Sequence, residues 1–183
     1  MTGSKVSQNL SLPPLTLVIG GAASGKSVVA EGLVMDTGLS RVYVATAQAW
    51  DDEMHTRIAL HRDRRDGWTT IEAPRDVAGA LGGIAAGSVV LLDCATMWLT
   101  NVMLGGGDVA SEEAALLAAL ASGAAPLVVV TNEVGMSIVP DNALARAFRD
   151  AQGRLNQRLA AQAGLVVAVW AGLPLVLKGA SPW

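Results

Sequence analysis

The sequence predicts an α/β fold in which a mostly parallel sheet is flanked by helices. Two observations carry this prediction. Runs of four to six residues, mostly Val, Leu and Ile, are typical of strands buried on both faces. These runs alternate along the chain with longer segments of helical pattern, and such alternation favours parallel strands joined by crossover helices.

The elements follow one another in a regular order. Strands are predicted at residues 15–19, 42–45, 89–92, 127–130 and 165–170, and residues 173–177 are expected to add an edge strand. Helices are predicted at about residues 26–35, 51–65, 75–85, 111–122 and 141–163. The helix at 51–65 opens on three acidic residues, which favour the positive end of the helix dipole. Three consecutive glycines at 105–107 predict a flexible loop.

Length and composition predict one domain. We expect a flexible N-terminal tail over residues 1–14 and a single P-loop domain over residues 15–183. The chain is 51% hydrophobic and 16% charged, which is apolar for a soluble monomer. The apolar surplus is expected to cover subunit interfaces or a broad pocket.

Charge and cysteine content exclude several classes of protein. A net charge of −3 argues against general nucleic-acid binding, which requires a basic face. The apolar runs are shorter than the roughly 18 to 20 residues that cross a bilayer, so no membrane insertion is expected. Cys94 is the single cysteine and cannot form an internal disulfide, which fits a reducing cytoplasm. The N-terminal segment lacks the apolar core of a signal peptide.

A glycine-rich segment with the pattern G-x4-G-K-S lies between the first predicted strand and the first predicted helix. Such a segment folds its N–H groups around phosphate oxygens at a helix N-terminus, where the dipole favours anions. Lys26 is expected to reach the β- and γ-phosphates of a nucleoside triphosphate, and the Ser27 hydroxyl is expected to ligate Mg²⁺. The predicted phosphate loop consists of Gly20, Gly21, Ala22, Ala23, Ser24, Gly25, Lys26 and Ser27.

Polar residues follow three other predicted strands. Asp93 ends the run VVLLD, and an acid in this place holds Mg²⁺ in P-loop proteins, directly or through water. Thr46 follows VYVA, and Glu133 follows LVVVTN. Because the carboxyl ends of parallel strands line the ligand crevice, we expect these residues to lie near the phosphate loop.

The segment RIALHRDRR, residues 57–65, places four arginines around His61. On a helix, Arg57, His61 and either Arg64 or Arg65 share one face, whereas His55 lies about 120° around the helix from His61. Two interpretations stay open on these residues alone. His61 is either a residue at the edge of the core beside solvated arginines, or a neutral imidazole that attacks phosphorus while the arginines neutralise phosphoryl charge.

Five segments together carry a resemblance to a known family: GGAASGKS, VYVATAQAWDDEMHTRIALHRDRR, WTTIEAP, LLDCATMWLTN and VVVTNEVGMSIVPDNALARAFRDAQGRLNQRLA. Their order and spacing resemble those of the bifunctional adenosylcobinamide kinase / adenosylcobinamide-phosphate guanylyltransferases of cobalamin biosynthesis. The resemblance covers about residues 15–178. It implies a RecA-like P-loop NTPase fold that assembles as a homotrimer.

The resemblance also implies two reactions. ATP or GTP phosphorylates the aminopropanol hydroxyl of adenosylcobinamide, and GTP then donates GMP to a histidine, from which adenosylcobinamide phosphate takes it to give adenosylcobinamide-GDP. The family's guanylylated histidine falls on His61, and Lys26 is the second expected catalytic residue. Besides the phosphate loop, the family's nucleotide contacts fall on Ala45, Thr46, Ala47, Arg62, Asp63, Arg64, Arg65, Glu72 and Asp93.

Two departures from the family pattern concern the nucleotide site. Ala23 stands where the family often has an arginine, so one cation near the phosphates is missing. Asp93 stands where some members have glutamate, which keeps the charge and shortens the side chain by one methylene.

Two other functions remain open on the sequence. One is a single-activity P-loop kinase of a small molecule, in which His61 merely binds phosphate. The other is a nucleotide-dependent switch that transfers nothing. The bifunctional enzyme is favoured, because a switch requires neither a histidine among arginines nor the TNEVG segment.

Overall fold

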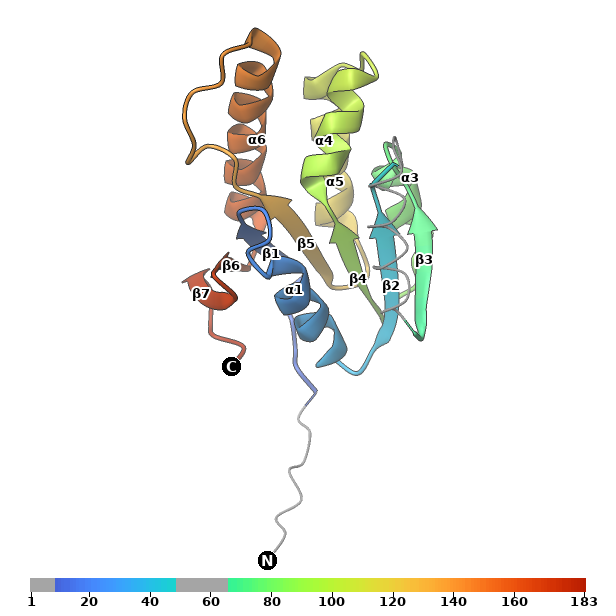
Figure 1. The fold of residues 1–183 in the computed structure, drawn as a ribbon. Coiled ribbons are helices and arrows are strands. Elements are labelled where there is room, and N and C mark those ends of the chain that lie inside the picture. The colour runs from blue at the N-terminus through green and yellow to red at the C-terminus, as the bar shows by residue number, and fades with distance from the viewer. Residues whose placement is uncertain (1–8, 49–65) are drawn as a thin grey trace, which may run out of the picture.

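The computed structural model describes residues 9–48 and 66–183. Within them the chain forms a seven-stranded sheet with the order β3-β2-β4-β5-β1-β6-β7 (Figure 1). Neighbouring strands are parallel except at one edge, where β7 runs antiparallel to β6. The predicted α/β fold with a mostly parallel sheet flanked by helices is confirmed.

All predicted strands are present. The strands are β1 (Leu15–Gly20), β2 (Ser40–Ala45), β3 (Trp68–Glu72), β4 (Ser88–Asp93), β5 (Leu127–Asn132), β6 (Leu165–Trp170) and β7 (Leu173–Lys178). The helices are α1 (Lys26–Met35), α3 (Val77–Gly82), α4 (Ala95–Leu104), α5 (Val109–Ser122) and α6 (Ala143–Gln162). Four predicted helices are confirmed. The bounds of α1 match the prediction, and the ends of α3, α5 and α6 differ from it by a few residues. The helix predicted at 51–65 lies outside the described residues.

Two elements of the structure, β3 and α4, were not predicted from the sequence. Strand β3 lies at the edge of the sheet and is largely exposed, so it lacks the apolar run of a buried strand. Helix α4 is buried on more than one side, including Trp98, Asn101 and Val102, so its sequence shows no clear amphipathic period. Both elements were hidden because the periodicity that marks a half-exposed element is absent from them.

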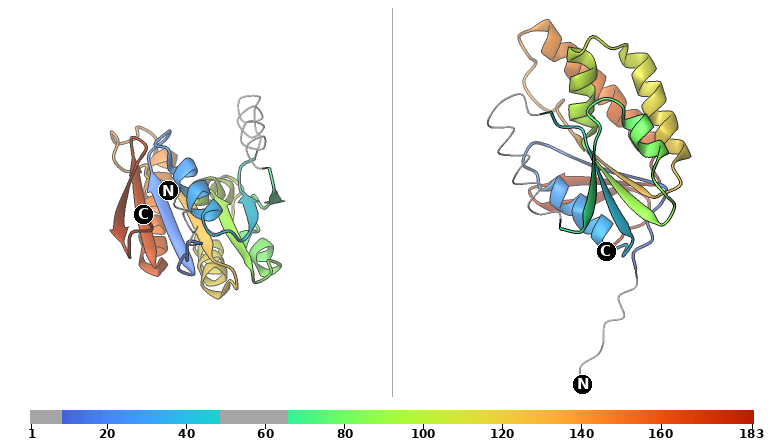
Figure 2. Two further views of the ribbon diagram at one scale, coloured as in Figure 1. Left: turned by 90° about the horizontal axis from the view of Figure 1, so that it is seen from below. Right: turned by 90° about the vertical axis from the view of Figure 1, so that its right-hand side faces the viewer.

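Helices cover the two faces of the sheet unequally. Helix α1 packs on one face, while α3, α4, α5 and α6 cover the other (Figures 1 and 2). Successive residues of a strand point to opposite faces. Accordingly, Val128 packs in the core beneath α1, whereas Val129 packs in the core with α4, α5 and α6.

Residues 9–14, which the sequence analysis places in the tail, pack against the domain. The Leu12 side chain is buried in the core beneath α1, and the Leu10 N–H donates to the carbonyl of Asp36 at 2.8 Å. The Pro14 carbonyl accepts from the N–H of Leu127 at 2.9 Å. Contacts with the domain therefore begin before Leu15.

Candidate functional site

The carboxyl ends of the parallel strands bring several expected site residues to one edge of the sheet. In the strand register, Ala45 is paired with Glu72 on one side and with Asp93 on the other. Glu133 follows β5, and its N–H donates to the carbonyl of Gly20 at 3.0 Å. The first residue of the phosphate loop and three carboxylates thus lie along one edge.

The backbone of the phosphate loop turns sharply into α1. The residue before the helix, Gly25, has φ 91°, in the left-handed region that glycine adopts without strain. Ala23, which stands where the family often has arginine, is also left-handed with φ 55°. Since α1 begins at Lys26, its first N–H groups and its positive dipole end are next to the loop.

The phosphate loop is hydrogen-bonded to the β6–β7 hairpin and packs closely against β6. The N–H of Gly172, in the turn of that hairpin, donates to the Ser24 carbonyl at 2.8 Å. A Cβ on Gly20 would lie 2.5 Å from Ser24 Oγ and 2.6 Å from the Val169 carbonyl oxygen. The absence of a side chain at Gly20 therefore lets the loop approach β6.

Two polar side chains of the phosphate loop, Lys26 and Ser24, are placed to donate hydrogen bonds to phosphate oxygens. The Lys26 Nζ donates to the Gly21 carbonyl at 3.1 Å, which keeps the ammonium beside the loop backbone. The Ser24 hydroxyl oxygen is buried and has no hydrogen-bond partner among the described residues. Buried polar groups are normally paired, so this hydroxyl is suited to donate to a ligand oxygen.

Ser27 and Asp93 lie together, as expected for Mg²⁺ ligands. The Ser27 Oγ is 3.5 Å from Asp93 Oδ2, and the Tyr43 hydroxyl donates to the same oxygen at 3.0 Å. Mg²⁺ prefers oxygen ligands and retains several waters, so one hydroxyl and one carboxylate beside a triphosphate fit this ion. No cluster of three or more His, Cys, Asp or Glu side chains occurs in the described part of the chain.

Thr46 is completely buried and joins the ends of two strands. Its hydroxyl donates to the Cys94 carbonyl at 2.8 Å and accepts from the Cys94 N–H at 2.7 Å. The Asn101 side-chain amide donates to the Thr46 carbonyl at 2.8 Å. The Thr46 hydroxyl is therefore engaged in holding β2 to the start of α4.

Cys94 is the N-cap of α4, where its Sγ accepts from the Met97 N–H at 3.4 Å. Burial, together with the neighbouring Asp93 carboxylate, raises the pKa of the Cys94 thiol to about 11. At neutral pH the side chain is a protonated thiol, which is a poor nucleophile.

A buried polar network that the sequence analysis missed supports the end of β5. The Gln152 side-chain amide donates to Thr131 Oγ1 at 3.0 Å and to Asn156 Oδ1 at 2.8 Å. Thr131 Oγ1 donates to Asn156 Oδ1 at 2.7 Å, and Asn156 Nδ2 donates to the Asn132 carbonyl at 3.0 Å. The signal in the sequence was the pair of amides in QGRLN, four residues apart and thus on one helix face.

An apolar cavity of about 510 Å³, called here the β6 cavity, adjoins the phosphate loop. Its lining includes Gly20, Gly21, Glu133, Ala168, Trp170 and Leu177. Glu133 is the charged residue of the lining, and the other lining side chains are apolar apart from Ser137. The apolar surplus of the composition is thus partly explained by a pocket.

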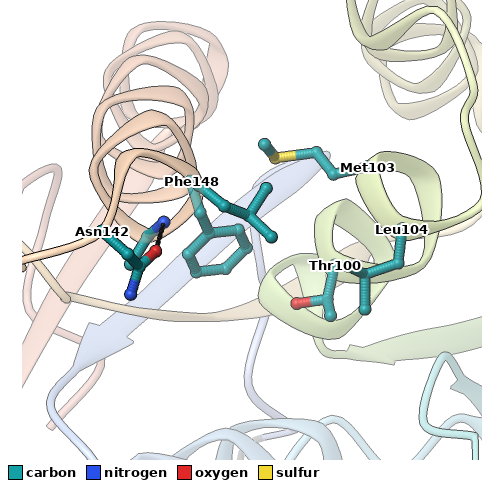
Figure 3. Close-up of a pocket in the computed structure, with 7 residues that line it drawn as sticks. Thr100, Met103, Leu104, Asn142 and Phe148 are labelled. Atoms are coloured by element: carbon teal, nitrogen blue, oxygen red, sulfur yellow. Dashed lines mark hydrogen bonds between the residues drawn. The ribbon is translucent and has the colours of Figure 1, made fainter.

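A second apolar cavity, the α4–α6 cavity, has a volume of about 380 Å³ and does not include the phosphate loop. Figure 3 shows Met103 and Leu104 of α4 facing Phe148 of α6. Asn142 lines this cavity as the N-cap of α6, and its side chain accepts from the Ala145 N–H at 2.8 Å. Since phosphate-binding groups are absent from the lining, the β6 cavity is the better candidate for the substrate of a phosphoryl transfer.

Several expected site residues lie outside the described part of the chain. They are the expected nucleophile and the basic segment that follows it, namely His61, Arg62, Asp63, Arg64 and Arg65. Among the described residues, the structure brings together the phosphate loop, Ala45, Glu72 and Asp93.

Comparison with known proteins gives one matching family, described as cobinamide kinase / cobinamide phosphate guanyltransferase, over residues 16–177. The bifunctional adenosylcobalamin biosynthesis protein CobP of Pseudomonas aeruginosa is 44% identical, over 89% of this chain and 96% of that protein. The corresponding CobU proteins of Salmonella typhimurium and Escherichia coli are 44% and 41% identical, each over 90% of this chain and 99% of theirs.

Among solved structures, a Pyrococcus horikoshii protein studied as PH0250 is similar with a TM-score of 0.54 and 10% identity, over 94% of this chain and 90% of that one. A RadB recombinase has a TM-score of 0.47 and 18% identity, over 86% of this chain and 74% of its own. The first likeness concerns the fold alone. The G-x4-G-K-S segment lies between β1 and α1 of a mostly parallel sheet, as the predicted P-loop fold requires.

Proposed function

Because the chain belongs to the cobinamide kinase / cobinamide phosphate guanyltransferase family, we propose that it carries out both reactions on adenosylcobinamide. A nucleoside triphosphate phosphorylates the aminopropanol hydroxyl, and GTP then supplies GMP to give adenosylcobinamide-GDP. The observation that carries this proposal is the 41–44% identity to bifunctional relatives over about nine tenths of the chain. The phosphate loop beside Asp93 supports it independently.

In the kinase step, the phosphate loop holds the triphosphate of ATP or GTP. Its N–H groups and the start of α1 bind the β- and γ-phosphates, Lys26 neutralises charge on the transferred group, and the Ser24 hydroxyl donates to a phosphate oxygen. Mg²⁺ held by Ser27 and Asp93 would supply further positive charge beside the same phosphates. Glu72 and residues 45–47 border the nucleotide along the same sheet edge.

In the transferase step, His61 is the nucleophile. One imidazole nitrogen forms a bond to the α-phosphorus of GTP, and the bond from that phosphorus to pyrophosphate breaks. A phosphate oxygen of adenosylcobinamide phosphate then attacks the phosphoramidate and releases His61. Arg62, Arg64 and Arg65 neutralise the phosphates during both displacements. These four residues lie outside the described part, so their roles rest on the sequence pattern.

We further propose a homotrimer that acts in the cytoplasm. Exposed apolar side chains such as Ile138 and Leu173, 93% and 71% exposed, support a covered surface in an assembly. Both reactions consume nucleoside triphosphates, which are cytoplasmic substrates, and Cys94 is a buried free thiol. In the described residues, no helix is both long and apolar enough for a transmembrane span.

Covalent labelling tests the proposed function. The protein is incubated with Mg²⁺ and GTP labelled at the α-phosphorus, then denatured, as wild type, His61→Ala and His55→Ala. We expect label that survives alkali and is lost in acid, as a phosphoramidate is, on wild type and His55→Ala but not on His61→Ala. Absence of label from all three, despite GTP binding and kinase activity, would replace the proposal with a single-activity kinase. Label on His61→Ala would refute His61 as the nucleophile.

A further inference from the structure

We propose that the β6 cavity is the binding site for the alcohol substrate of the kinase step. The aminopropanol arm of a cobinamide enters the cavity, one face of the corrin ring lies on its apolar rim, and the Glu133 carboxylate accepts the proton of the reacting hydroxyl. This inference rests on the proposed function and assigns a substrate site and a base within it.

The β6 cavity lies directly beside the phosphate loop. Gly20 and Gly21 form part of its wall and are also the first residues of the phosphate loop. The Lys26 ammonium is bound to the Gly21 carbonyl at 3.1 Å, so the charge that faces the transferred phosphoryl group lies beside this wall. A hydroxyl in the cavity is therefore close to the end of the nucleotide at which transfer takes place.

Glu133 is held in place by two hydrogen bonds and can still accept another. Its N–H donates to the Gly20 carbonyl at 3.0 Å, and its Oε1 accepts from the Gly135 N–H at 2.5 Å. The first hydrogen bond fixes the Glu133 backbone beside the phosphate loop, and the second holds its carboxylate against the turn that follows β5. A carboxylate has about four lone-pair sites, so it retains the capacity to accept from a substrate hydroxyl.

The chemistry of the step is balanced by these groups. The alcohol oxygen forms a bond to the γ-phosphorus, and the bond from that phosphorus to the bridging oxygen of the nucleoside diphosphate breaks. The hydroxyl proton passes to Glu133, which later releases it to water. General base catalysis of this kind contributes about 10²- to 10⁴-fold to a rate.

The size and surface of the cavity favour a cobinamide. Its volume of about 510 Å³ lies within the range of small-molecule sites and accommodates the arm. A corrin ring is too large for it and must rest on the rim, where Met136, Trp170 and Leu177 are 79%, 72% and 60% exposed. Exposed apolar side chains beside a pocket are typical of a surface that a ligand covers.

The charge of Glu133 also favours release of the phosphorylated product. The alcohol substrate is uncharged at its reacting end, whereas the product carries a phosphate of two negative charges. Glu133 therefore repels the product and favours its release from the cavity.

Variants of the cavity wall test the site. Ala168→Leu fills the cavity with a larger side chain. Leu177→Ala removes an apolar contact at the rim and introduces no larger side chain, so it still tests the site if Ala168→Leu does not fold. We expect each to raise the KM for adenosylcobinamide by about tenfold or more, with little change in the KM for ATP. Leu144→Ala is the matched control, because Leu144 is 58% exposed beside the α4–α6 cavity, and it should leave both KM values unchanged.

Glu133→Gln tests the base. We expect the kcat of the kinase step to fall by about 100-fold with little change in the KM for adenosylcobinamide, because the amide retains the shape but not the proton affinity. Labelling of the protein with GMP from GTP should remain at the wild-type level, since that step does not use Glu133. Cobinamide, which absorbs visible light, should also quench the fluorescence of wild-type protein more strongly than that of Trp170→Phe.

The outcomes separate the possible failures. If wild type makes product and accepts GMP label while Ala168→Leu, Leu177→Ala and Glu133→Gln keep wild-type constants, the substrate site is refuted and the proposed function stands. If Leu177→Ala changes the oligomeric state but not the KM for adenosylcobinamide, the rim is a subunit interface and the inference is overturned. If wild type forms neither product nor label, the proposed function fails and the inference falls with it.

Discussion

The Tyr43 hydroxyl donates to Asp93 Oδ2 at 3.0 Å, and the Ser27 hydroxyl approaches the same oxygen at 3.5 Å. Tyr43 lies on β2, two residues before the end of the strand, so a neighbouring strand orients the acid that ends β4. A hydrogen bond from a residue behind a metal ligand fixes the direction of the ligand's lone pairs.

Tyr43→Phe should therefore raise the Mg²⁺ concentration for half-maximal activity by about tenfold, as expected when a partner behind a metal ligand is removed. The free energy of unfolding should fall by about 1 kcal/mol for the lost hydrogen bond. Mg²⁺ titrations of both activities measure the first effect. Trp68→Phe is the control, because the Trp68 ring contacts the Tyr43 ring edge-on at a centroid distance of 6.2 Å without touching Asp93. Equal Mg²⁺ dependence in wild type and Tyr43→Phe would contradict this role.

Gly20→Ala should lower the free energy of unfolding by about 1 to 3 kcal/mol, because the new Cβ overlaps Ser24 Oγ and the Val169 carbonyl. It should also weaken nucleotide binding, since relief of the overlap displaces the phosphate loop from β6. Gly21→Ala is a matched control next to it, because a Cβ there meets nothing within 4 Å. Urea denaturation and nucleotide titration compare the two, and equal loss of stability in both variants would contradict the packing of the loop against β6.

Much of the fold could be predicted because its signals are local. Buried parallel strands show as apolar runs, and Gly25 marks the turn into α1. Helix α4 could not be predicted, because a helix buried on several sides loses its period, and Trp98 and Val102 also read as strand formers. Strand β3 could not be predicted either, because an exposed edge strand is fixed by its pairing with β2 rather than by its own pattern.

The candidate site was predictable only where a motif or a strand end marked it. Ser27 and Asp93 were found in this way, and the structure brings them together. Tyr43 gave no signal, since its position depends on the pairing of β2 with β4, which is not written in either segment alone. The β6 cavity also depends on chain segments far apart, because Gly20 and Leu177 meet only in the folded sheet.

Ala23→Arg restores the cation that is common in the family and should tighten nucleotide binding. An exposed ion pair contributes up to about 1 kcal/mol, so we expect the Kd to fall by about three- to fivefold at low salt. Salt screens exposed charges, and the gain should shrink as ionic strength rises. Met35→Arg adds the same charge at the far end of α1 and should change the Kd little. An equal gain in both variants would mean that net charge, rather than position, is responsible.

Asn156→Leu should lower the free energy of unfolding by about 2 to 4 kcal/mol, because it leaves several buried partners of the network without a hydrogen bond. These partners are the Thr131 hydroxyl, the Gln152 amide and the Asn132 carbonyl. The control is Gln157→Leu, an exposed position of the same helix, with an expected change within about 0.5 kcal/mol. Urea denaturation measures both, and a loss of stability as small as the control's would show that the network does not support β5.

The raised pKa of Cys94 predicts a loss of stability in alkali. The pKa of the thiol is 9.0 in the unfolded chain and about 11 in the folded protein. Between these values the folded state binds more protons than the unfolded state, so the free energy of unfolding falls as pH rises. A pKa difference of this size lowers the free energy of unfolding by about 3 kcal/mol. This loss is complete above the folded pKa and absent below pH 9.

Cys94→Ser removes the titrating thiol and retains an oxygen that can accept from the Met97 N–H as the N-cap of α4. Urea denaturation of both proteins in EDTA, at about pH 8 and about pH 11, measures the contribution of the thiol alone, because the lysines and the tyrosine are the same in both proteins. Wild type should lose about 2 kcal/mol more than the serine variant over this range, because pH 11 lies at the folded pKa and the rest of the loss comes above it. Parallel losses would mean that the thiol is reached by water in the folded protein, and alkylation of Cys94 by iodoacetamide would then be fast at pH 8, whereas a buried protonated thiol reacts slowly.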